Sequence, residues 1–165
     1  MVGFTFEKAL TMLVKYMSGI DQKKPTLFHS VRVGSFLWNH SYSEDIQIAG
    51  LLHDSLEDTN ISETEIEENF WVYVLGIVQA NSKNMSLPKQ DRLEDIVIRC
   101  ANHSQDALIV KVADIYDNFL FYTRQWNIWE IERCQRLAWY IKNHKKEEYK
   151  DDIFDKLDEI QCFKK

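Results

Sequence analysis

Cysteine, proline and glycine are all scarce in this chain of 165 residues, which contains three cysteines, two prolines and five glycines. Hydrophobic residues make up 45% of the sequence and aromatic residues 13%. This composition argues against disorder and for a helix-rich globular domain. The cysteines at 100, 134 and 162 are well separated and lack the spacing of a metal site, so we expect reduced thiols.

Three further features are missing: an apolar stretch long enough to span a membrane, an apolar N-terminal block and an excess of basic residues. Glu7 lies where a secretion signal would be apolar, so we expect a cytoplasmic protein without a membrane partner. The net charge of −6 argues against binding to nucleic acid, whose backbone requires a basic surface. A phosphorylated small ligand would need positive charge concentrated at its site, from a metal ion and a few lysines.

Apolar residues recur with a helical period of 3.6 along the chain, and alternating strand-like segments are scarce. We therefore predict an all-α fold of about eight helices in a single domain, residues 1–165. A chain of this length is large enough to bury a hydrophobic core. The predicted helices lie near residues 4–18, 27–40, 44–57, 62–80, 89–101, 105–124, 127–144 and 147–162. Ser62 and Glu65 form a capping box at the start of one of them.

Charge is concentrated in one otherwise apolar run, residues 49–59, which contains His53, Asp54, Glu57 and Asp58. On a continuous helix His53 would lie one turn below Glu57, and Asp54 one turn below Asp58. Because the preceding residues are apolar, these groups would be partly desolvated unless a cation compensated them. The run therefore predicts a metal site.

Two residues elsewhere on apolar, helix-like runs extend this set: His29 upstream and Asp114 downstream. Two imidazoles and two carboxylates offer mixed nitrogen and oxygen donors, which suit Mn²⁺ or Fe²⁺ with open water positions. The same set suits thiolate-type zinc poorly.

Four segments in order carry a resemblance to a known family: residues 29–34, 51–59, 86–92 and 110–118. In them the chain resembles the HD-domain metal phosphohydrolases, and most closely the hydrolase domain of the RelA/SpoT alarmone enzymes and their small free-standing relatives. The resemblance implies a compact HD-domain helical bundle with a core at residues 22–124. Helices within residues 127–162 would pack on that core.

The resemblance also implies roles for individual residues. One Mn²⁺ ion, or another divalent ion such as Fe²⁺, would be held by four residues: His29, His53, Asp54 and Asp114. Glu57 and Asp58 would position and deprotonate the attacking water, because a carboxylate near the metal can accept its proton. The nucleotide would be contacted by a small set of polar and basic side chains: Lys23, Lys24, Lys89, Arg92 and Asn118.

The activity that the resemblance implies is hydrolysis of guanosine 3′,5′-bis(diphosphate), in which a metal-bound water attacks the 3′ phosphorus and releases pyrophosphate. Residues 22–28 form a shorter loop than the family's and lack its glycine, and Met85 stands where the small hydrolases tend to carry a lysine. These differences leave open an HD phosphohydrolase of another nucleotide, such as the 2′-phosphate of NADPH or a nucleoside monophosphate. A non-catalytic nucleotide-sensing module is the alternative from a different class.

Aromatic residues on the charged C-terminal segments leave the assembly state open. Trp126, Trp129 and Trp139 lie on otherwise charged predicted helices. They either pack back on the bundle or mark the face of a homodimer.

Overall fold

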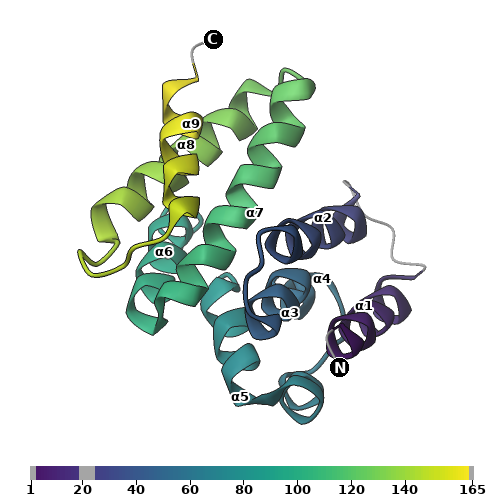
Figure 1. The fold of residues 1–165 in the computed structure, drawn as a ribbon. Coiled ribbons are helices and arrows are strands. Elements are labelled where there is room, and N and C mark those ends of the chain that lie inside the picture. Colours follow the sequence, from purple (N-terminus) through teal and green to yellow (C-terminus); the bar gives the residue numbers. More distant parts are fainter. Residues whose placement is uncertain (1–2, 19–24, 164–165) are drawn as a thin grey trace.

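The computed structural model describes residues 3–18 and 25–163 (Figure 1). These ranges contain helices and no strand, which confirms the predicted all-α fold. In chain order the helices are α1 (Phe4–Met17), α2 (Thr26–Asn39), α3 (Glu44–Leu52), α4 (Ser55–Asp58), α5 (Glu63–Asn81), α6 (Arg92–His103), α7 (Gln105–Arg124), α8 (Ile128–His144), the 3₁₀ helix η1 (Asp152–Asp155) and α9 (Lys156–Cys162).

Helix α7 runs through the middle of the molecule. It packs against α2, α3 and α5 on one side and against α6, α8 and α9 on the other, so it joins the two halves of the bundle (Figure 1). Most of α7 is buried, and its sequence is largely apolar. Polar groups on this helix, such as Asp114 and Asn118, are therefore held in the interior, where burial is costly without a partner.

Three predicted helices differ from those observed. The prediction of one helix over 44–57 was wrong, because α3 ends at Leu52 and α4 begins at Ser55. The predicted helix 62–80 is bent at Trp71, where φ is 70° and ψ is 159°.

The third difference is the start of the last helix, which was predicted at residue 147 and is observed at Asp152 as a 3₁₀ turn. The side-chain amide of Gln105 accepts from the backbone N–H of Lys150 at 2.9 Å and donates to its carbonyl at 3.2 Å. These contacts with α7 satisfy the backbone of Lys150 without a helix. A tertiary contact therefore overrides the local helical pattern.

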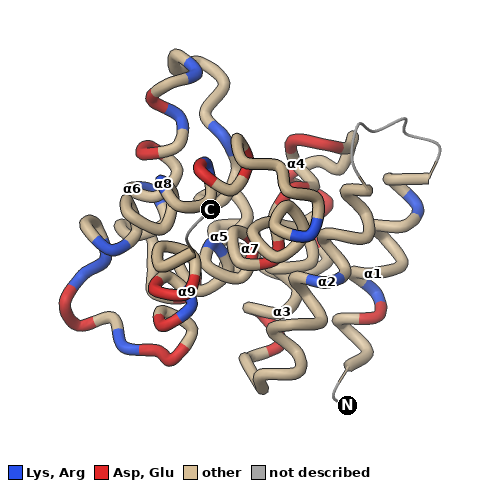
Figure 2. The backbone as a smooth tube through the Cα atoms, turned by 90° about the horizontal axis from the view of Figure 1, so that it is seen from above, with Lys and Arg blue, Asp and Glu red and all other residues tan. Residues whose placement is uncertain are grey.

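Charged residues of both signs are interspersed along the outer helices and loops (Figure 2). Within the described ranges, no helix is long and apolar enough to cross a membrane. The described cysteines form no disulfide.

Candidate metal and catalytic site

The turn between α3 and α4 places two of the predicted ligands. The ring Nδ1–H of His53 donates to the carbonyl oxygen of Gly50 at 2.8 Å, and this is the carbonyl that the next N–H, that of Asp54, would use in a continuous helix. The side chain thus competes with the helical hydrogen bond, and the helix stops there. His53 and Asp54 consequently lie in the turn between the two helices. Asp54 precedes α4, and its carbonyl oxygen accepts from the backbone N–H of Asp58 at 3.0 Å.

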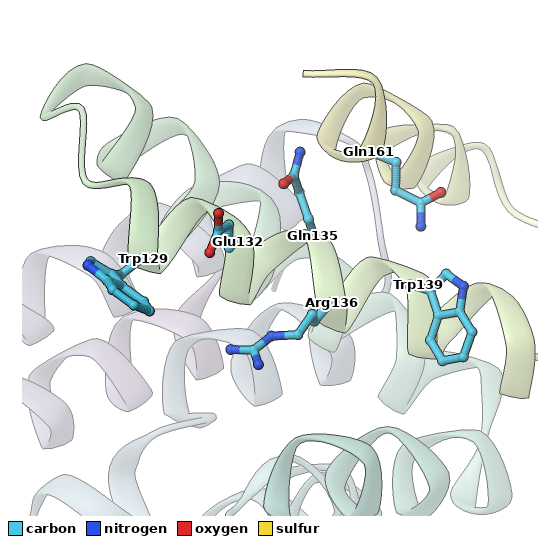
Figure 3. A pocket seen from close by; sticks show the side chains of 6 residues that line it. All are labelled: Trp129, Glu132, Gln135, Arg136, Trp139 and Gln161. Atoms are coloured by element: carbon cyan, nitrogen blue, oxygen red, sulfur yellow. The ribbon is translucent and has the colours of Figure 1, made fainter. Parts of the chain in front are cut away.

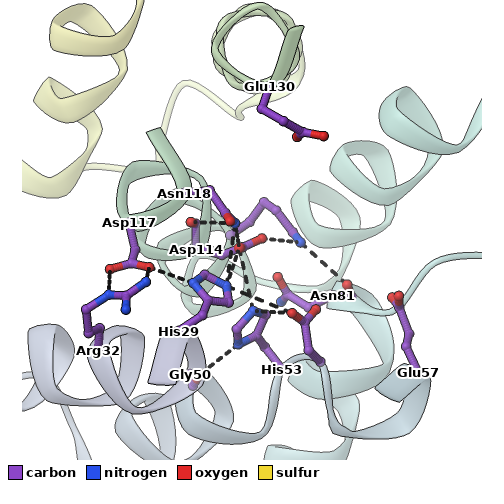
Figure 4. Close-up of polar contacts among 12 residues, drawn as sticks. His29, Arg32, Gly50, His53, Glu57, Asn81, Asp114, Asp117, Asn118 and Glu130 are labelled. Carbon is purple, nitrogen blue, oxygen red and sulfur yellow. Dashed lines mark hydrogen bonds and ion pairs between the residues drawn. The ribbon is translucent and has the colours of Figure 1, made fainter. Parts of the chain in front are cut away.

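Four groups from three parts of the chain converge at this turn: His29 on α2, His53 and Asp54 after α3, and Asp114 on α7. We call them the histidine–aspartate cluster. Asp114 Oδ1 lies 3.1 Å from His29 Nε2 and 3.6 Å from His53 Nε2. Asp54 Oδ2 lies 3.3 Å from His53 Nε2 and 3.9 Å from His29 Nε2. Figure 4 shows both imidazole rings directed toward the Asp114 carboxylate.

The orientation of His29 is set by a second carboxylate. Asp117 Oδ2 accepts from His29 Nδ1 at 2.6 Å, and Asp117 also accepts two hydrogen bonds from the guanidinium of Arg32, each of 2.7 Å. With Nδ1 occupied in this way, Nε2 is the ring nitrogen left for the cluster. A carboxylate behind a histidine is the arrangement that orients metal-binding imidazoles in proteins.

Asp114 is held by two neighbours on its own helix. Lys111 Nζ donates to its Oδ2 at 3.1 Å, and Asn118 Nδ2 donates to its Oδ1 at 2.6 Å. Lys111 is itself buried, so its charge is paired in the interior. These contacts fix which carboxylate oxygen faces the two histidines.

The charges in the cluster shift one another's titration. Burial by itself lowers the pKa of His53, but the carboxylates of Asp54 and Asp114 outweigh it and raise this pKa to about 10. Burial by itself raises the pKa of Asp54, and the facing His53 overcomes this and lowers it. The pKa of Asp114 is lowered well below its usual value against the cost of burial, chiefly by Lys111 and then by the histidines. Both carboxylates are thus kept ionised and able to bind a cation.

A divalent ion fits these residues. Ligand atoms of His29, His53 and Asp114 all lie within 4.8 Å of one another. Within the described part of the chain, the fully buried Nε2 of His53 lacks a hydrogen bond of ordinary geometry. The raised pKa keeps a proton on Nε2 while this nitrogen faces the two carboxylates. Because His53 donates through Nδ1, a divalent cation that replaced the Nε2 proton would be bound by a neutral imidazole, the form in which histidine ligates metals. The described residues therefore offer a possible metal-binding group of nitrogen and oxygen donors.

Glu57 lies on α4 beside the cluster and not within it (Figure 4). Its carboxylate accepts from the backbone N–H of Lys83 at 2.6 Å and is paired with the Lys83 ammonium. Glu57 and Asp54 line the same pocket as Asp114. Asp58, which is half-buried on α4, is not among the described residues that line this pocket.

The predicted substrate contacts are brought together only in part. Asn118 and Arg92 line the pocket with the two aspartates, and Arg92 is held there by the carbonyl oxygens of Leu87 and Met85. Lys89 is exposed outside the pocket. The predicted contacts Lys23 and Lys24 lie outside the described residues.

Sequence reasoning assigned no role to several residues that the structure places here. Lys83, Lys111 and Arg133 line the pocket, and Asp117 lies behind His29. Lys111 and Asp117 flank Asp114 at helical spacings of three residues, a signal that was present in the sequence. Lys83 and Arg133 come from a predicted loop and a distant helix, so no local pattern could have identified them.

Comparison with known proteins gives matches over most of this chain. The HD domain family model matches residues 10–115. Guanosine-3′,5′-bis(diphosphate) 3′-pyrophosphohydrolase MESH1 of Danio rerio is 31% identical over 117 residues, which are 70% of this chain and 60% of that protein. The protein of the same name from Homo sapiens is 29% identical over 127 residues, which are 76% of this chain and 65% of the human protein.

The chain spans about three fifths of the length of the MESH1 relatives from Danio rerio and Xenopus tropicalis. A solved structure described as "A metazoan ortholog of SpoT hydrolyzes ppGpp and plays a role in starvation responses" superposes with a TM-score of 0.79 at 25% identity. The superposition covers 97% of this chain and 95% of that chain.

Proposed function

This chain belongs to the HD-domain family, and we propose that it is a metal-dependent hydrolase of guanosine 3′,5′-bis(diphosphate) that removes the 3′ diphosphate as pyrophosphate. The observation that carries the proposal is the convergence of two buried imidazoles on two ionised carboxylates, with the Nε2 of His53 free of an ordinary hydrogen bond. The names of the relatives supply the substrate.

In this proposal the histidine–aspartate cluster holds one divalent ion, Mn²⁺ by the choice of donors. A bound divalent ion lowers the pKa of water and polarises a phosphoryl oxygen. Asp117 keeps Nε2 of His29 directed at the ion, and Lys111 and Asn118 keep Asp114 in place.

Proton transfer falls to the acids of α4. Glu57 lines the pocket beside the cluster, and it takes the proton from the attacking water, assisted by Asp58. Lys83 fixes the Glu57 carboxylate through its backbone N–H and its ammonium. A proton acceptor held in one orientation near the reacting water lowers the barrier more than a mobile one.

The anionic substrate is recognised by cations at the rim of the pocket. Arg92, Lys83 and Arg133 line it from three separate parts of the chain. These three side chains bring positive charge to the pocket in a protein of net charge −6. Lys23, Lys24 and Lys89 stay contacts proposed from the sequence resemblance. Phosphoryl transfer depends mainly on positioning and on stabilising charge, which such a set supplies. Asn118 completes the proposed contacts.

The test is a parallel assay of the Mn²⁺-loaded protein on guanosine tetraphosphate, NADPH and nucleoside monophosphates, with pyrophosphate and phosphate measured separately. We expect Mn²⁺-dependent release of pyrophosphate from guanosine tetraphosphate. Phosphate release from NADPH or a monophosphate alone would keep the hydrolytic chemistry but overturn the substrate. If every substrate stayed intact while one of them bound, the protein would be a nucleotide sensor.

A second prediction concerns Asp117. In Asp117→Asn, the neutral amide no longer supports His29 as a carboxylate does, so Mn²⁺ affinity should fall about 10–100-fold while turnover at saturating Mn²⁺ stays near that of the unchanged protein. Isothermal titration calorimetry with Mn²⁺ measures the metal affinity. Asp95→Asn is the matched control, because Asp95 also pairs with an arginine, Arg99, on a neighbouring turn and should leave the affinity unchanged. Equal metal affinity in both variants would contradict the role of Asp117.

A further inference from the structure

The outer face of α8 carries two exposed tryptophans. Trp129 is 82% exposed and Trp139 is 55% exposed, whereas the opposite side of the helix buries Ile131, Cys134 and Ile141. Both tryptophans line one groove on this face, and tryptophan is enriched among the residues that dominate protein interfaces. Glu132 and Arg136 lie between the two tryptophans on the same face, and Figure 3 shows these side chains spaced along the helix.

The spacing of these four residues is that of a helix-pairing seam. Steps of three, four and three residues separate Trp129, Glu132, Arg136 and Trp139, and this is the alternation by which one side of a helix meets another helix. We call these four residues the α8 seam. The tryptophans stand about 15 Å apart along the helix axis, at a rise of about 1.5 Å per residue.

The α8 seam is also symmetric about Cys134. Trp129 and Trp139 lie at equal distances from it in sequence, and so do Glu132 and Arg136. When a helix packs antiparallel on its own copy across a two-fold axis, each residue faces the one at the mirrored position. Trp129 then faces the partner's Trp139, and Glu132 faces the partner's Arg136. The acid of each copy therefore meets the base of the other.

We propose that this protein forms a two-fold homodimer in which the α8 helices of two copies pack antiparallel through the α8 seam. A groove of about 590 Å³ lined by the seam, Gln135 and Gln161 of α9 receives the tryptophans of the second copy. The exposed parts of four tryptophans, 82% of each Trp129 and 55% of each Trp139, supply a part of the roughly 1,600 Å² that a stable interface buries. The charged pairs at the centre determine the antiparallel register, as polar residues do in helix pairs.

Sedimentation velocity of the full chain between micromolar and several hundred micromolar concentrations tests the dimer. We expect a concentration-dependent monomer–dimer equilibrium, and we expect Trp129→Ala combined with Trp139→Ala to weaken it more than tenfold, because buried tryptophans dominate interface energies. Val72→Ala is the control, since Val72 is 66% exposed on α5, which is not among the helices that pack closely on α8. A chain that stays monomeric throughout, or a dimer that both changes affect equally, would overturn the proposal.

Charge exchange tests the antiparallel pairing itself. Glu132→Arg and Arg136→Glu place like charges opposite each other, so each variant alone should be monomeric. Mixed together, they should form a heterodimer, because the arginines of one copy then face the glutamates of the other. Glu132 also interacts within its own chain, but an intrachain pair cannot produce recovery on mixing. Circular dichroism shows whether the variants remain folded, and folded variants that stay monomeric when mixed would refute the pairing.

Discussion

The change Asp54→Ala is expected to abolish metal binding and turnover together. Asp54 Oδ2 lies within 4 Å of Nε2 of both cluster histidines, so its loss removes one of two carboxylates that would balance a divalent charge. Without the metal, the transition state would also lose the several kcal/mol of charge stabilisation that a divalent ion supplies to phosphoryl transfer. Turnover should therefore fall by about a thousandfold or more.

Thermal unfolding with and without Mn²⁺ reports metal binding separately from activity. A ligand at about 100 times its Kd stabilises a protein by about 2.7 kcal/mol, which corresponds to a rise in Tm of about 5–10 °C for a chain of this size. We expect this rise in the unchanged protein and its absence in Asp54→Ala. Asp158→Ala, which alters an exposed acid on α9, should keep both the rise and the activity. A full Mn²⁺ response in Asp54→Ala would remove Asp54 from the ligand set.

The change Glu57→Gln should lower kcat about 10²–10⁴-fold, the usual contribution of a general base, while Mn²⁺ affinity stays unchanged. Glu57 faces Lys83 and not the histidines, so the amide leaves the histidine–aspartate cluster intact. The neutral amide of the substituted glutamine cannot accept the proton of the attacking water. Single-turnover kinetics at saturating substrate, together with a metal titration, separates the two effects.

Asp58→Asn is the matched comparison for Glu57→Gln, since both acids lie on α4 but only Glu57 lines the pocket. We expect the smaller loss of rate from Asp58→Asn. If Glu57→Gln retained near-full turnover, Glu57 would not be the proton acceptor. If it lost metal as well as rate, Glu57 would contribute to the ion's site and not to proton transfer.

Most of the helices could be predicted because each buries one apolar face. The apolar residues of such a face recur with a period of 3.6 in the local sequence. Helix α7 was predicted over the same residues that the structure shows, 105–124. Two of the predictions failed where a side chain competes for a backbone group. Gln105 does this at Lys150, and His53 does it at the carbonyl of Gly50.

The all-α class and the short list of histidines and aspartates able to bind a cation follow from the order of residues alone, because residue type sets donor chemistry and periodicity sets helices. Helix packing was needed to show that α2, the turn after α3, and α7 bring ligand atoms of His29, His53 and Asp114 to within 4.8 Å of one another. It also placed Asp117 behind His29 and Lys83 on Glu57. Such distances depend on how helices pack, and packing joins residues that no local pattern relates.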